Sequence, residues 1–291
     1  MPSIPTTKAA TLIEALPYLQ RYRGKTFLIK MGGSAMENPE LVSDVMRDIT
    51  FLEIAGINPI IVHGGGKAIS AAMTNAGLEA KFVGGLRVTT PQAIAIVEKT
   101  LAKSINPQLV NLINQHGGRA TGIPGTGVFQ ARRILATDDQ GQPADIGRVG
   151  EVESCLTDDI LYATSSNIVP VLTPLGSEIG TGKTLNVNAD LAAAALACTL
   201  KPTKLVYISD VPGLLRDPKD PTTLIPTLTR TEAEAYMADG TISGGMIPKV
   251  RSALDALDAG VGKVHFIDGR VPHTLLLEIF TKQGSGTQII K

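Results

Sequence analysis

The sequence predicts an α/β fold, with a mainly parallel central sheet covered by helices on both faces and preceded by an N-terminal helix. Three observations lead to this prediction. Short apolar, β-prone runs alternate with helical patterns along the chain. Runs such as residues 26–30 and 58–63 are almost entirely apolar, as is typical of strands in a parallel sheet. Each of these two runs ends in a glycine loop that leads into a helix.

The composition is that of a globular protein and argues against several functional classes. Of the 291 residues, 43% are hydrophobic and 19% are charged, and 27 basic residues balance 27 acidic ones. A nucleic-acid-binding protein would usually carry a basic excess, and a base-stacking surface would need more aromatic side chains than the 4% present. No segment approaches the roughly 18 apolar residues of a membrane span, and the N-terminus lacks the apolar core of a signal peptide.

The cysteines and histidines indicate a reduced protein without a metal site. Cys155 and Cys198 lie far apart in the sequence and form no CxxC pair, which favours free thiols and a cytoplasmic location. The four histidines form no pair at metal-ligand spacing.

An amphipathic helix is predicted from about residue 8 to residue 23. Its apolar positions recur at helical spacing, at Ala9, Leu12, Ile13, Leu16 and Leu19. Pro17 inside this pattern predicts a kink or a break. The apolar stripe must be buried, either on its own domain or on another subunit.

The first half of the chain then continues with helices, strands and two hairpins. Asn38, Pro39 and Glu40 supply a cap, a first-turn proline and an acidic first turn for a helix that Gly56 ends. The turn-rich residues 138–141 mark the tip of a hairpin whose flanks alternate apolar and polar side chains. In order, we predict a helix over 38–55, a strand over 58–63, a helix over 67–75, a hairpin over 81–90, a helix over 91–117, a strand over 119–123, a hairpin over 128–153, a helix over 157–163 and a strand over 168–172.

The second half begins with a predicted glycine-rich loop over residues 174–184, and a soft lobe boundary is expected near 172–185. After it we predict a helix over 191–200, a strand over 204–209, a loop over 212–221, helices over 231–239 and 247–259, a strand over 263–267, a helix over 272–280 and a glycine-rich tail from residue 284. The expected organisation is an N-terminal helix over 1–24 that serves oligomerisation or regulation. One domain over 25–291 follows, with an N-lobe at about 25–180 and a C-lobe at about 181–291.

Lys30 is the first candidate functional residue. It ends an apolar strand on the side where open α/β sheets bind ligands, and Gly32 and Gly33 follow it. These glycines allow a sharp turn and let backbone N–H groups approach a ligand. The second strand ends in the same way at residues 64–66, so the two loops could face each other across a cleft. Taken alone, the first stretch is better explained as a plain strand–turn–helix corner with a solvated lysine.

Two common phosphate-binding motifs are absent. Residues 180–184 resemble the end of a P-loop, but the GxxxxGK[ST] pattern would need a glycine where Ser177 stands. The loop at Gly32 and Gly33 lacks the third glycine of GxGxxG and an acidic residue on a second strand, so a dehydrogenase is only weakly supported.

The remaining polar residues at strand ends suit phosphoryl transfer. This reaction needs phosphates held in line and their developing charge neutralised. Lys30 and Lys249 would supply positive charge together with glycine N–H groups, and Asp190 could hold the two lysines. Arg87 could bind a substrate carboxylate through paired hydrogen bonds. Taken singly, Asp190 fits the first turn of a helix, and Arg87 fits an exposed hairpin.

Six motifs together resemble the amino acid kinase family and, within it, the acetylglutamate kinases. They are Lys-Met-Gly-Gly-Ser from residue 30, Val-His-Gly-Gly-Gly from 62, Gly-Leu-Arg-Val-Thr from 85, Asn-Val-Asn-Ala-Asp from 186, Ser-Asp-Val-Pro-Gly-Leu from 209 and Gly-Gly-Met-Ile-Pro-Lys from 244. The resemblance covers about residues 25–291. It implies a three-layer αβα sandwich and the ATP-dependent phosphorylation of the side-chain carboxylate of N-acetyl-L-glutamate to N-acetyl-L-glutamyl 5-phosphate, in arginine biosynthesis.

The resemblance also implies a role for each matching residue. Lys30 and Lys249 match the two lysines that stabilise the transition state, and Asp190 matches the aspartate that organises them. The implied substrate-binding residues, in the N-lobe and at the start of the C-lobe, are Gly65, Gly66, Arg87, Asn186 and Asn188. The implied phosphate- or ATP-binding residues are Gly32, Gly33, Ser209, Asp210, Gly213, Leu214, Gly245 and Met246. ATP is expected with Mg²⁺, which would bridge ATP oxygens without a dedicated protein cage.

The N-terminal helix and the chain end are similar to those of arginine-inhibited acetylglutamate kinases. In that group the helix interlocks dimers into a hexamer, a trimer of dimers, and arginine binds between the helix and the C-lobe. The matching residues here are Tyr18, His265, Glu278 and Gly284. Without the resemblance, His265 would simply end a strand and Glu278 would be a solvated helix residue. Some relatives also bind a P-II signalling protein, a partner that the sequence leaves open.

One segment departs from the family pattern, and alternative functions stay open. Where these kinases usually have Gly-Leu-Ser-Gly-x-Asp-Gly, residues 122–128 read Gly-Ile-Pro-Gly-Thr-Gly-Val, so the resemblance does not imply the shape of that loop. Carbamate, aspartate, glutamate 5- and uridylate kinases are rivals within the family, and Arg87 and Asn186 favour the acetylated substrate. A catalytically silent arginine sensor is the rival outside it, against which intact Lys30, Asp190 and Lys249 argue.

Overall fold

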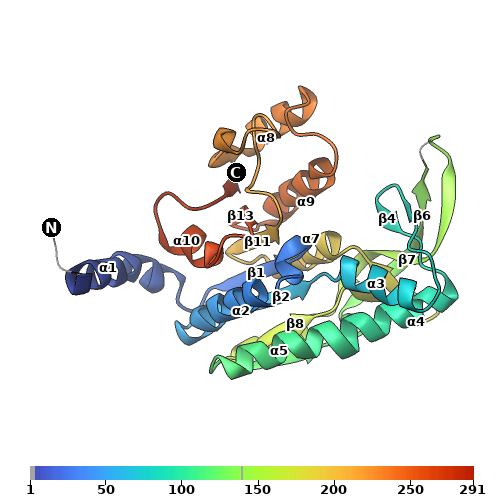
Figure 1. The fold of residues 1–291 in the computed structure, drawn as a ribbon, viewed down its shortest axis with the longest axis horizontal. Coiled ribbons are helices and arrows are strands. Elements are labelled where there is room, and N and C mark those ends of the chain that lie inside the picture. Colours follow the sequence, from blue (N-terminus) through green and yellow to red (C-terminus); the bar gives the residue numbers. More distant parts are fainter. Residues whose placement is uncertain (1–3, 139) are drawn as a thin grey trace.

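A twisted sheet of eight strands forms the middle layer of the computed structural model, which describes residues 4–138 and 140–291 (Figure 1). The strands lie in the order β12 (Thr227–Thr229), β14 (Thr287–Ile290), β13 (Lys263–Asp268), β11 (Lys204–Ser209), β1 (Thr26–Met31), β2 (Asn58–His63), β8 (Val169–Leu172) and β5 (Ala120–Ile123). All neighbours from β13 to β5 run parallel, and β14 is antiparallel to β13. The predicted mainly parallel sheet is therefore confirmed.

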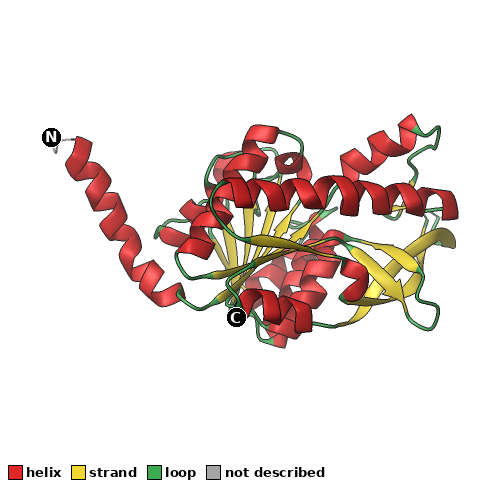
Figure 2. Cartoon of the chain, turned by 90° about the horizontal axis from the view of Figure 1, so that it is seen from below, coloured by secondary structure: helices red, strands yellow, loops and turns green. Residues whose placement is uncertain are grey.

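Helices cover both faces of this sheet, as the three-layer prediction requires (Figure 2). Alternate residues of β1 belong to different cores: Leu28 packs on one face, whereas Phe27 and Ile29 pack on the other. The face of Leu28 is covered by α6 (Asp158–Ser165), α7 (Ala189–Leu200), α8 (Arg230–Ala238) and α9 (Met246–Ala259). The face of Phe27 is covered by α2 (Pro39–Ile54), α3 (Gly66–Asn75), α4 (Pro91–Glu98), α5 (Asn106–Gln115) and α10 (Thr274–Phe280).

The N-terminal helix α1 (Ile4–Tyr22) projects from one end of the molecule (Figures 1 and 2). It is continuous through Pro17, so the predicted break does not occur. Its C-terminal part is anchored, because Tyr22 is buried and packs edge-on against Phe27 of β1. No helix in the described ranges is both long and apolar enough to cross a bilayer.

A small closed barrel of four strands stands beside the sheet and corrects one prediction. The hairpin predicted over 128–153 is present as β6 (Phe129–Thr137) and β7 (Pro143–Cys155). However, the predicted loop over 174–184 contains β9 (Leu175–Glu178), and β10 (Thr184–Val187) follows it; both pair with the hairpin. Gly176 made the segment look like a loop, yet it is needed in the strand, because a Cβ there would lie 2.8 Å from the Cβ of Ala131.

Two further differences from the predictions concern the chain end and the long helix. The predicted glycine-rich tail forms β14, and the short strand β12 was not predicted. The predicted helix over 91–117 is α4 and α5 joined by a π-helical segment, Lys99–Ile105, which shifts the helical register. The hairpin predicted over 81–90 is confirmed as β3 (Phe82–Val83) and β4 (Leu86–Arg87).

The segment that departs from the family pattern is tightly held. Gly122 and Ile123 lie in β5, and a short 3₁₀ turn, Gly125–Gly127, follows. The N–H of Gly125 donates to Oγ1 of Thr173 at 2.9 Å, and a Cβ on Gly125 would lie 2.0 Å from the carbonyl oxygen of Thr173. This close backbone approach accounts for the glycine at position 125.

Candidate active site

Lys30 lies near the carboxyl end of β1 and shares the face of the sheet that α7 covers. Side chains alternate along a strand, so Lys30 lies on the same side as Leu28, which packs in one core with α7. The side chain of Lys30 is 9% exposed, and its Nζ lies 2.8 Å from Oδ1 of Asp190. A nearly buried ammonium group is therefore paired with a carboxylate.

Asp190 links this lysine to a second one. It lies in the first turn of α7, where the helix N-terminus favours a carboxylate, and Oδ1 of Asn188 caps the helix by accepting the N–H of Asp190 at 2.8 Å. The other carboxylate oxygen of Asp190, Oδ2, lies 3.8 Å from Nζ of Lys249 on α9. The three residues predicted as the catalytic group thus lie together, and two lysines against one aspartate leave positive charge in excess.

The two glycine loops lie against each other beside this cluster. A Cβ on Gly32 would lie 2.0 Å from Nζ of Lys30, because that side chain runs over the position two residues on. Gly33 has a φ of 67° and lies next to the backbone and carboxylate of Asp210. A Cβ on Gly64 would lie 3.7 Å from Cα of Gly32. A side chain at position 32 would therefore collide with Lys30, whereas a Cβ at position 64 would make ordinary contacts with the loop after β1.

One pair of cavities opens on the β2 side of the cluster, and we call it the Arg87 cavity. The narrower part, about 170 Å³, is lined by all five predicted substrate-binding residues: Gly65, Gly66, Arg87, Asn186 and Asn188. The wider part, about 650 Å³, shares Gly65, Gly66, Phe82 and Arg87 with it and extends to Gly33 and Asp210. The side chain of Asn186 donates to Oγ1 of Thr89 at 3.1 Å.

Arg87 is a buried cation without a carboxylate partner in the part of the chain that the structure describes. Its guanidinium donates to the carbonyl of Gly66 at 2.6 Å and to Oγ of Ser70 at 2.8 Å, and it stacks over the ring of Phe82. Burial lowers the pKa of Arg87. Because a buried charge is costly unless it is paired, this site favours an anionic ligand.

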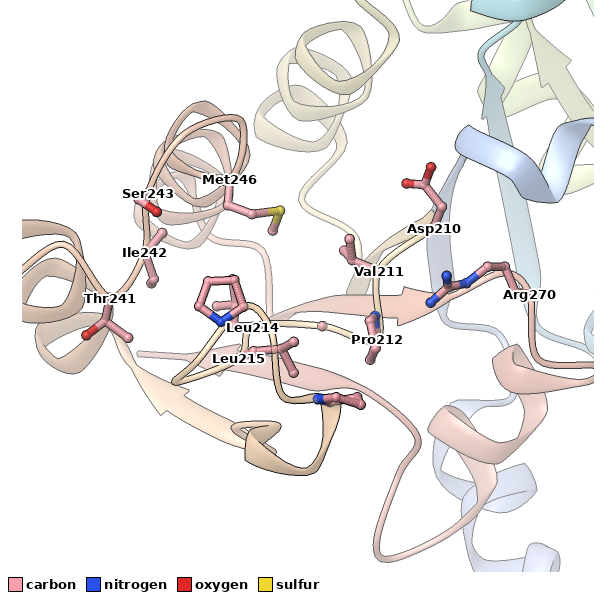
Figure 3. Close-up of a pocket in the computed structure, with 13 residues that line it drawn as sticks. Asp210, Val211, Pro212, Leu214, Leu215, Thr241, Ile242, Ser243, Met246 and Arg270 are labelled. Carbon is pink, nitrogen blue, oxygen red and sulfur yellow. The ribbon is translucent and has the colours of Figure 1, made fainter.

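A second cavity, which we call the Asp210 cavity, opens on the β11 side of the cluster and measures about 400 Å³ (Figure 3). Four of the residues predicted to bind ATP line it: Asp210, Gly213, Leu214 and Met246. Asp210 and Arg270 lie on one side of the space, and Thr241, Ile242 and Met246 lie on the other (Figure 3). Three other residues predicted to bind ATP, Gly32, Ser209 and Gly245, do not line this cavity, and Gly33 lines the wider part of the Arg87 cavity next to Asp210.

Sequence reasoning missed part of this lining, above all Arg270 and residues 241–243. Arg270 follows β13, and its guanidinium pairs with both oxygens of Asp268, through Nε at 2.9 Å and Nη2 at 2.8 Å. The only available signal was its place just after a strand end. Residues 241–243 lie between α8 and α9 and carry no motif that singles them out.

A third cavity lies between α1 and α10, measures about 570 Å³, and collects all four residues predicted for an effector site: Tyr18, His265, Glu278 and Gly284. Three charged or polar groups form a chain along its wall. Nζ of Lys204 lies 2.9 Å from Nε2 of His265, and Nδ1 of His265 lies 2.6 Å from Oε1 of Glu278. Glu278 is buried, so the prediction that the sequence alone would give, a solvated helix residue, is wrong.

Burial and hydrogen bonds set the ionisation states of Lys204, His265 and Glu278. Burial lowers the pKa of His265 to about 4, so the ring is neutral near pH 7; it accepts from Lys204 and donates to Glu278. Burial also lowers the pKa of Lys204 to about 8. Burial opposes the charged form of Glu278, but hydrogen bonds from His265 and from the N–H groups of Ser285 and Gly286 leave its pKa below the usual value.

Comparisons with known proteins agree with this architecture. A model of the amino acid kinase family matches residues 25–268. The chain is 63% identical to a protein of Akkermansia muciniphila named acetylglutamate kinase, over 98% of this chain and 96% of that protein.

Solved structures resemble the fold at lower sequence identity. N-acetylglutamate synthase from Neisseria gonorrhoeae, complexed with coenzyme A and N-acetyl-glutamate, gives a TM-score of 0.85 at 26% identity. The match covers 97% of this chain but only 63% of the synthase. The same synthase complexed with coenzyme A and L-arginine gives a TM-score of 0.80 at 25% identity, over 97% of this chain and 65% of that one. Carbamate kinase from Giardia lamblia bound to AMP-PNP gives a TM-score of 0.66 at 18% identity, over 92% of this chain and 99% of that one, and shows the shared fold.

Proposed function

Because this chain belongs to the amino acid kinase family, we propose that it transfers the γ-phosphoryl group of ATP to the side-chain carboxylate of N-acetyl-L-glutamate. The product is N-acetyl-L-glutamyl 5-phosphate, an intermediate of arginine biosynthesis. A carboxylate oxygen forms a bond to the γ-phosphorus, the bond from that phosphorus to the bridging oxygen breaks, and ADP leaves. The observation that carries this proposal is the Lys30–Asp190–Lys249 cluster between two cavities.

In this proposal the two lysines stabilise the transition state. An ammonium group has three donors, so Lys30 can contact Asp190 and still donate to phosphoryl oxygens. Lys249 contacts Asp190 at 3.8 Å, a distance that leaves its ammonium group available for the phosphates. Asp190 holds both groups in place before ATP arrives, and pre-placed charges cost no reorganisation during the reaction.

The Arg87 cavity is the proposed acceptor site. The unpaired guanidinium of Arg87 would bind the α-carboxylate of N-acetyl-L-glutamate, and Asn186 and Asn188 would hydrogen-bond its polar groups. Gly65 and Gly66, at the end of β2 and the start of α3, would offer N–H groups to the reacting carboxylate. This arrangement favours a dicarboxylate with a blocked amine over carbamate or a nucleotide.

The Asp210 cavity is the proposed nucleotide site. Its wall is partly apolar, from Leu214, Ile242 and Met246, which suits a base, and Gly32 and Gly33 lie toward the cluster, where phosphates would bind. We keep Ser209 and Gly245 in the proposed site because they directly precede Asp210 and Met246, which line the cavity. ATP would enter as its magnesium complex, with the ion on phosphate oxygens, water and at most one or two carboxylates.

The direct test of the activity is ADP release from the purified protein with a panel of acceptors. We expect turnover with N-acetyl-L-glutamate and little with L-glutamate, L-aspartate, carbamate or UMP. A preference for unacetylated glutamate would overturn the proposed acceptor, and ATP binding without any turnover would favour a sensor that lacks catalysis.

Lys249→Ala tests the mechanism. Removing one charge-stabilising donor should lower kcat on the order of a hundredfold or more, measured as steady-state ADP release. Arg251→Ala is the matched control, because Arg251 is an exposed cation on the same helix. Unchanged turnover in Lys249→Ala would exclude the proposed role of this lysine.

We further propose feedback inhibition by arginine at the α1–α10 cavity, within a hexamer built as a trimer of dimers. Support comes from the four predicted residues that line one cavity and from the arginine complex of the similar synthase. The carboxylate of Glu278 would attract the guanidinium of arginine, and Lys204 would attract its α-carboxylate.

The remaining expectations are less specific and stay proposals. The N-lobe, at about 25–180, would bind the acceptor, and the C-lobe, at about 181–291, would bind ATP and arginine. Free thiols at Cys155 and Cys198 are consistent with a cytoplasmic enzyme. Co-purification with a P-II signalling protein would test whether that protein is a partner.

A further inference from the structure

His63 is a fully buried histidine at the end of β2, next to the glycine loop of the acceptor site. It lies on the face of the sheet that α5 covers, in step with Ile61. Its Nδ1 lies 2.9 Å from the carbonyl oxygen of Gly64, and its Nε2 lies 3.2 Å from Nδ2 of Asn106. A carbonyl oxygen only accepts, so the proton is on Nδ1, and Nε2 accepts from Asn106. Burial lowers the pKa of His63 to about 4, so the ring is neutral near pH 7.

Asn106 fixes this arrangement from the other side. It is the first residue of α5, directly after the π-helical segment, and is buried. Its Nδ2 also donates to the carbonyl of Val171 in β8 at 2.9 Å, so both of its N–H bonds are used. A Cβ on Gly122 of β5 would lie 2.2 Å from Oδ1 of Asn106, which shows how closely the side chain is enclosed. The ring of His63 therefore has a fixed tautomer and position.

The bond to Gly64 sets the direction of the next N–H group. No peptide bond in the described residues is cis, and in a trans peptide the C=O and the following N–H point in opposite directions. The carbonyl of Gly64 faces His63, so the N–H of Gly65 faces away from it, and both glycines line the Arg87 cavity, whereas His63 does not. The N–H groups of Gly65 and Gly66 donate to no acceptor within residues 4–138 and 140–291. Gly64 is held on its other side as well, because its N–H donates to Met31 at 2.7 Å.

From this geometry we infer that His63 is a positioning residue that aims the N–H of Gly65 at an oxygen of the reacting carboxylate or phosphoryl group. The inference rests on the proposed function, since it assigns a role within that acceptor site. The alternative is a histidine that only satisfies buried polar groups. The two roles make different demands on position 63. A positioning role needs a side chain that donates a hydrogen bond to the carbonyl of Gly64, whereas a packing role needs only a polar side chain of suitable size.

The test compares His63→Asn with His63→Gln. The amide nitrogen of asparagine lies where Nδ1 of histidine lies and can still donate to Gly64. The longer glutamine reaches the position of Nε2 and can accept from Asn106, but it leaves Gly64 without a donor. His116→Gln is the control, because His116 is a half-buried histidine that contacts Ser43 and lines none of the three cavities. Each variant is assayed as the full-length protein for kcat, for KM of both substrates and for thermal stability.

We expect His63→Gln to lower kcat about tenfold to a hundredfold, with KM for ATP unchanged, and His63→Asn to retain most of the rate. Equal rates in the two variants, with wild-type turnover present, would overturn the inference and leave the proposed function intact. Lack of turnover in the wild-type protein would overturn the proposed function and this inference with it. Should both variants fail to fold, ¹⁵N NMR of histidine-labelled wild-type protein decides instead: a ring protonated on Nε2 would overturn the inference, and one protonated on Nδ1 would support it.

Discussion

Gly32 is glycine because Lys30 occupies the space that a side chain would fill. Residues two apart in a strand share a face, and here the lysine continues along that face toward Asp190. The Cβ of any other residue at position 32 would lie 2.0 Å from Nζ of Lys30. The motif lysine–x–glycine is therefore one unit, in which the glycine leaves the path open for the ammonium group.

Gly32→Ala should accordingly act through Lys30 rather than through stability. The added methyl group must push the ammonium group away from Asp190, and we expect kcat to fall on the order of a hundredfold, with a modest loss of stability. Gly127→Ala is the control, since no atom lies within 4 Å of a Cβ there and its φ is not positive. ADP-release rates and thermal melts of both variants give the answer, and a fully active Gly32→Ala protein would show that the lysine can take another path.

Arg87→Lys separates recognition from chemistry. Lysine keeps the positive charge but loses the planar pair of donors and the stacking on Phe82. We expect KM for N-acetyl-L-glutamate to rise about tenfold or more, with a smaller change in kcat and in KM for ATP. Steady-state kinetics with each substrate varied in turn will measure this. A change confined to KM for ATP would place the acceptor elsewhere.

At the scale of elements, a hydrogen bond joins a buried carboxylate of α2 to the half-exposed histidine before α10. Asp48 of α2 is 1% exposed, and its Oδ1 lies 2.6 Å from Nδ1 of His273, which has a φ of 58°. The segment from Arg270 to His273 leads from the Asp210 cavity to α10, which carries Glu278 of the α1–α10 cavity. The pair thus fixes the connection between the proposed nucleotide and effector sites.

The pH dependence of stability should report on Asp48. Burial raises its pKa to about 6, against the opposing hydrogen bond and charge of His273, from an ordinary value of 3.8. The folded state therefore binds the proton more tightly than the unfolded state, so this contribution to stability is complete below about pH 4 and is lost as pH rises to about 6. The loss amounts to about 2–3 kcal/mol.

Asp48→Asn should remove this decrease of stability with rising pH, and it should raise the free energy of unfolding at pH 7. Urea unfolding of the wild type and the variant between pH 4 and pH 7 measures it. Glu151→Gln, which changes an exposed carboxylate on β7, is the control. A variant that is less stable than wild type at pH 7 would mean that the interaction of Asp48 with His273 outweighs the cost of burying the carboxylate.

The sequence correctly predicted those helices and strands that are marked by residues close together in the chain. Apolar runs, the Asn38 cap and the glycine loops depend on neighbours in the chain, and β1, β2 and α2 appear where expected. Strands β9, β10, β12 and β14 have four residues or fewer, which is too short for a clear alternating pattern. β9 and β10 pair with each other, but each of the four strands also pairs with a strand far away in the sequence. The same holds for the candidate site. Motifs in the sequence singled out Lys30, Asp190 and Arg87, whereas Arg270 was missed because only the fold brings it to the Asp210 cavity.

At the scale of the whole molecule, the order of the strands sets the order of the sites. β13, β11, β1 and β2 are neighbours and run parallel, so their carboxyl ends share one edge of the sheet. Arg270 and Asp210 follow the first two strands, the Lys30 loop follows the third, and residues 64–66 follow the fourth. The Asp210 cavity therefore lies mainly on the β11 side of Lys30 and the Arg87 cavity mainly on the β2 side, and the two share Asp210. Transfer between the two proposed substrates would require them to be bound side by side in this way.

The helix α1 carries the surface that we propose as a subunit interface. Leu12 and Ile13 on it are 71% and 67% exposed, and the exposed Leu16 on the same helix lines a hollow together with Phe51 and Ile54 of α2. An exposed apolar patch that continues onto the body of the protein is typical of a subunit interface. Tyr18 on the same helix lines the α1–α10 cavity, so the proposed interface and the proposed arginine site share one element.

Deleting residues 1–23 should therefore reduce the proposed hexamer to dimers and abolish or strongly weaken arginine inhibition, while ADP release without arginine continues. The deletion removes both the apolar face and Tyr18, but none of the residues that line the Arg87 or Asp210 cavities. A triple variant, Leu12→Ser with Ile13→Ser and Leu16→Ser, keeps Tyr18 and should lose the hexamer alone if interface and effector site are separable. Light scattering gives the mass of each assembly, and activity against arginine concentration gives the inhibition. A deletion variant that stays hexameric and fully inhibited would show that α1 serves neither purpose.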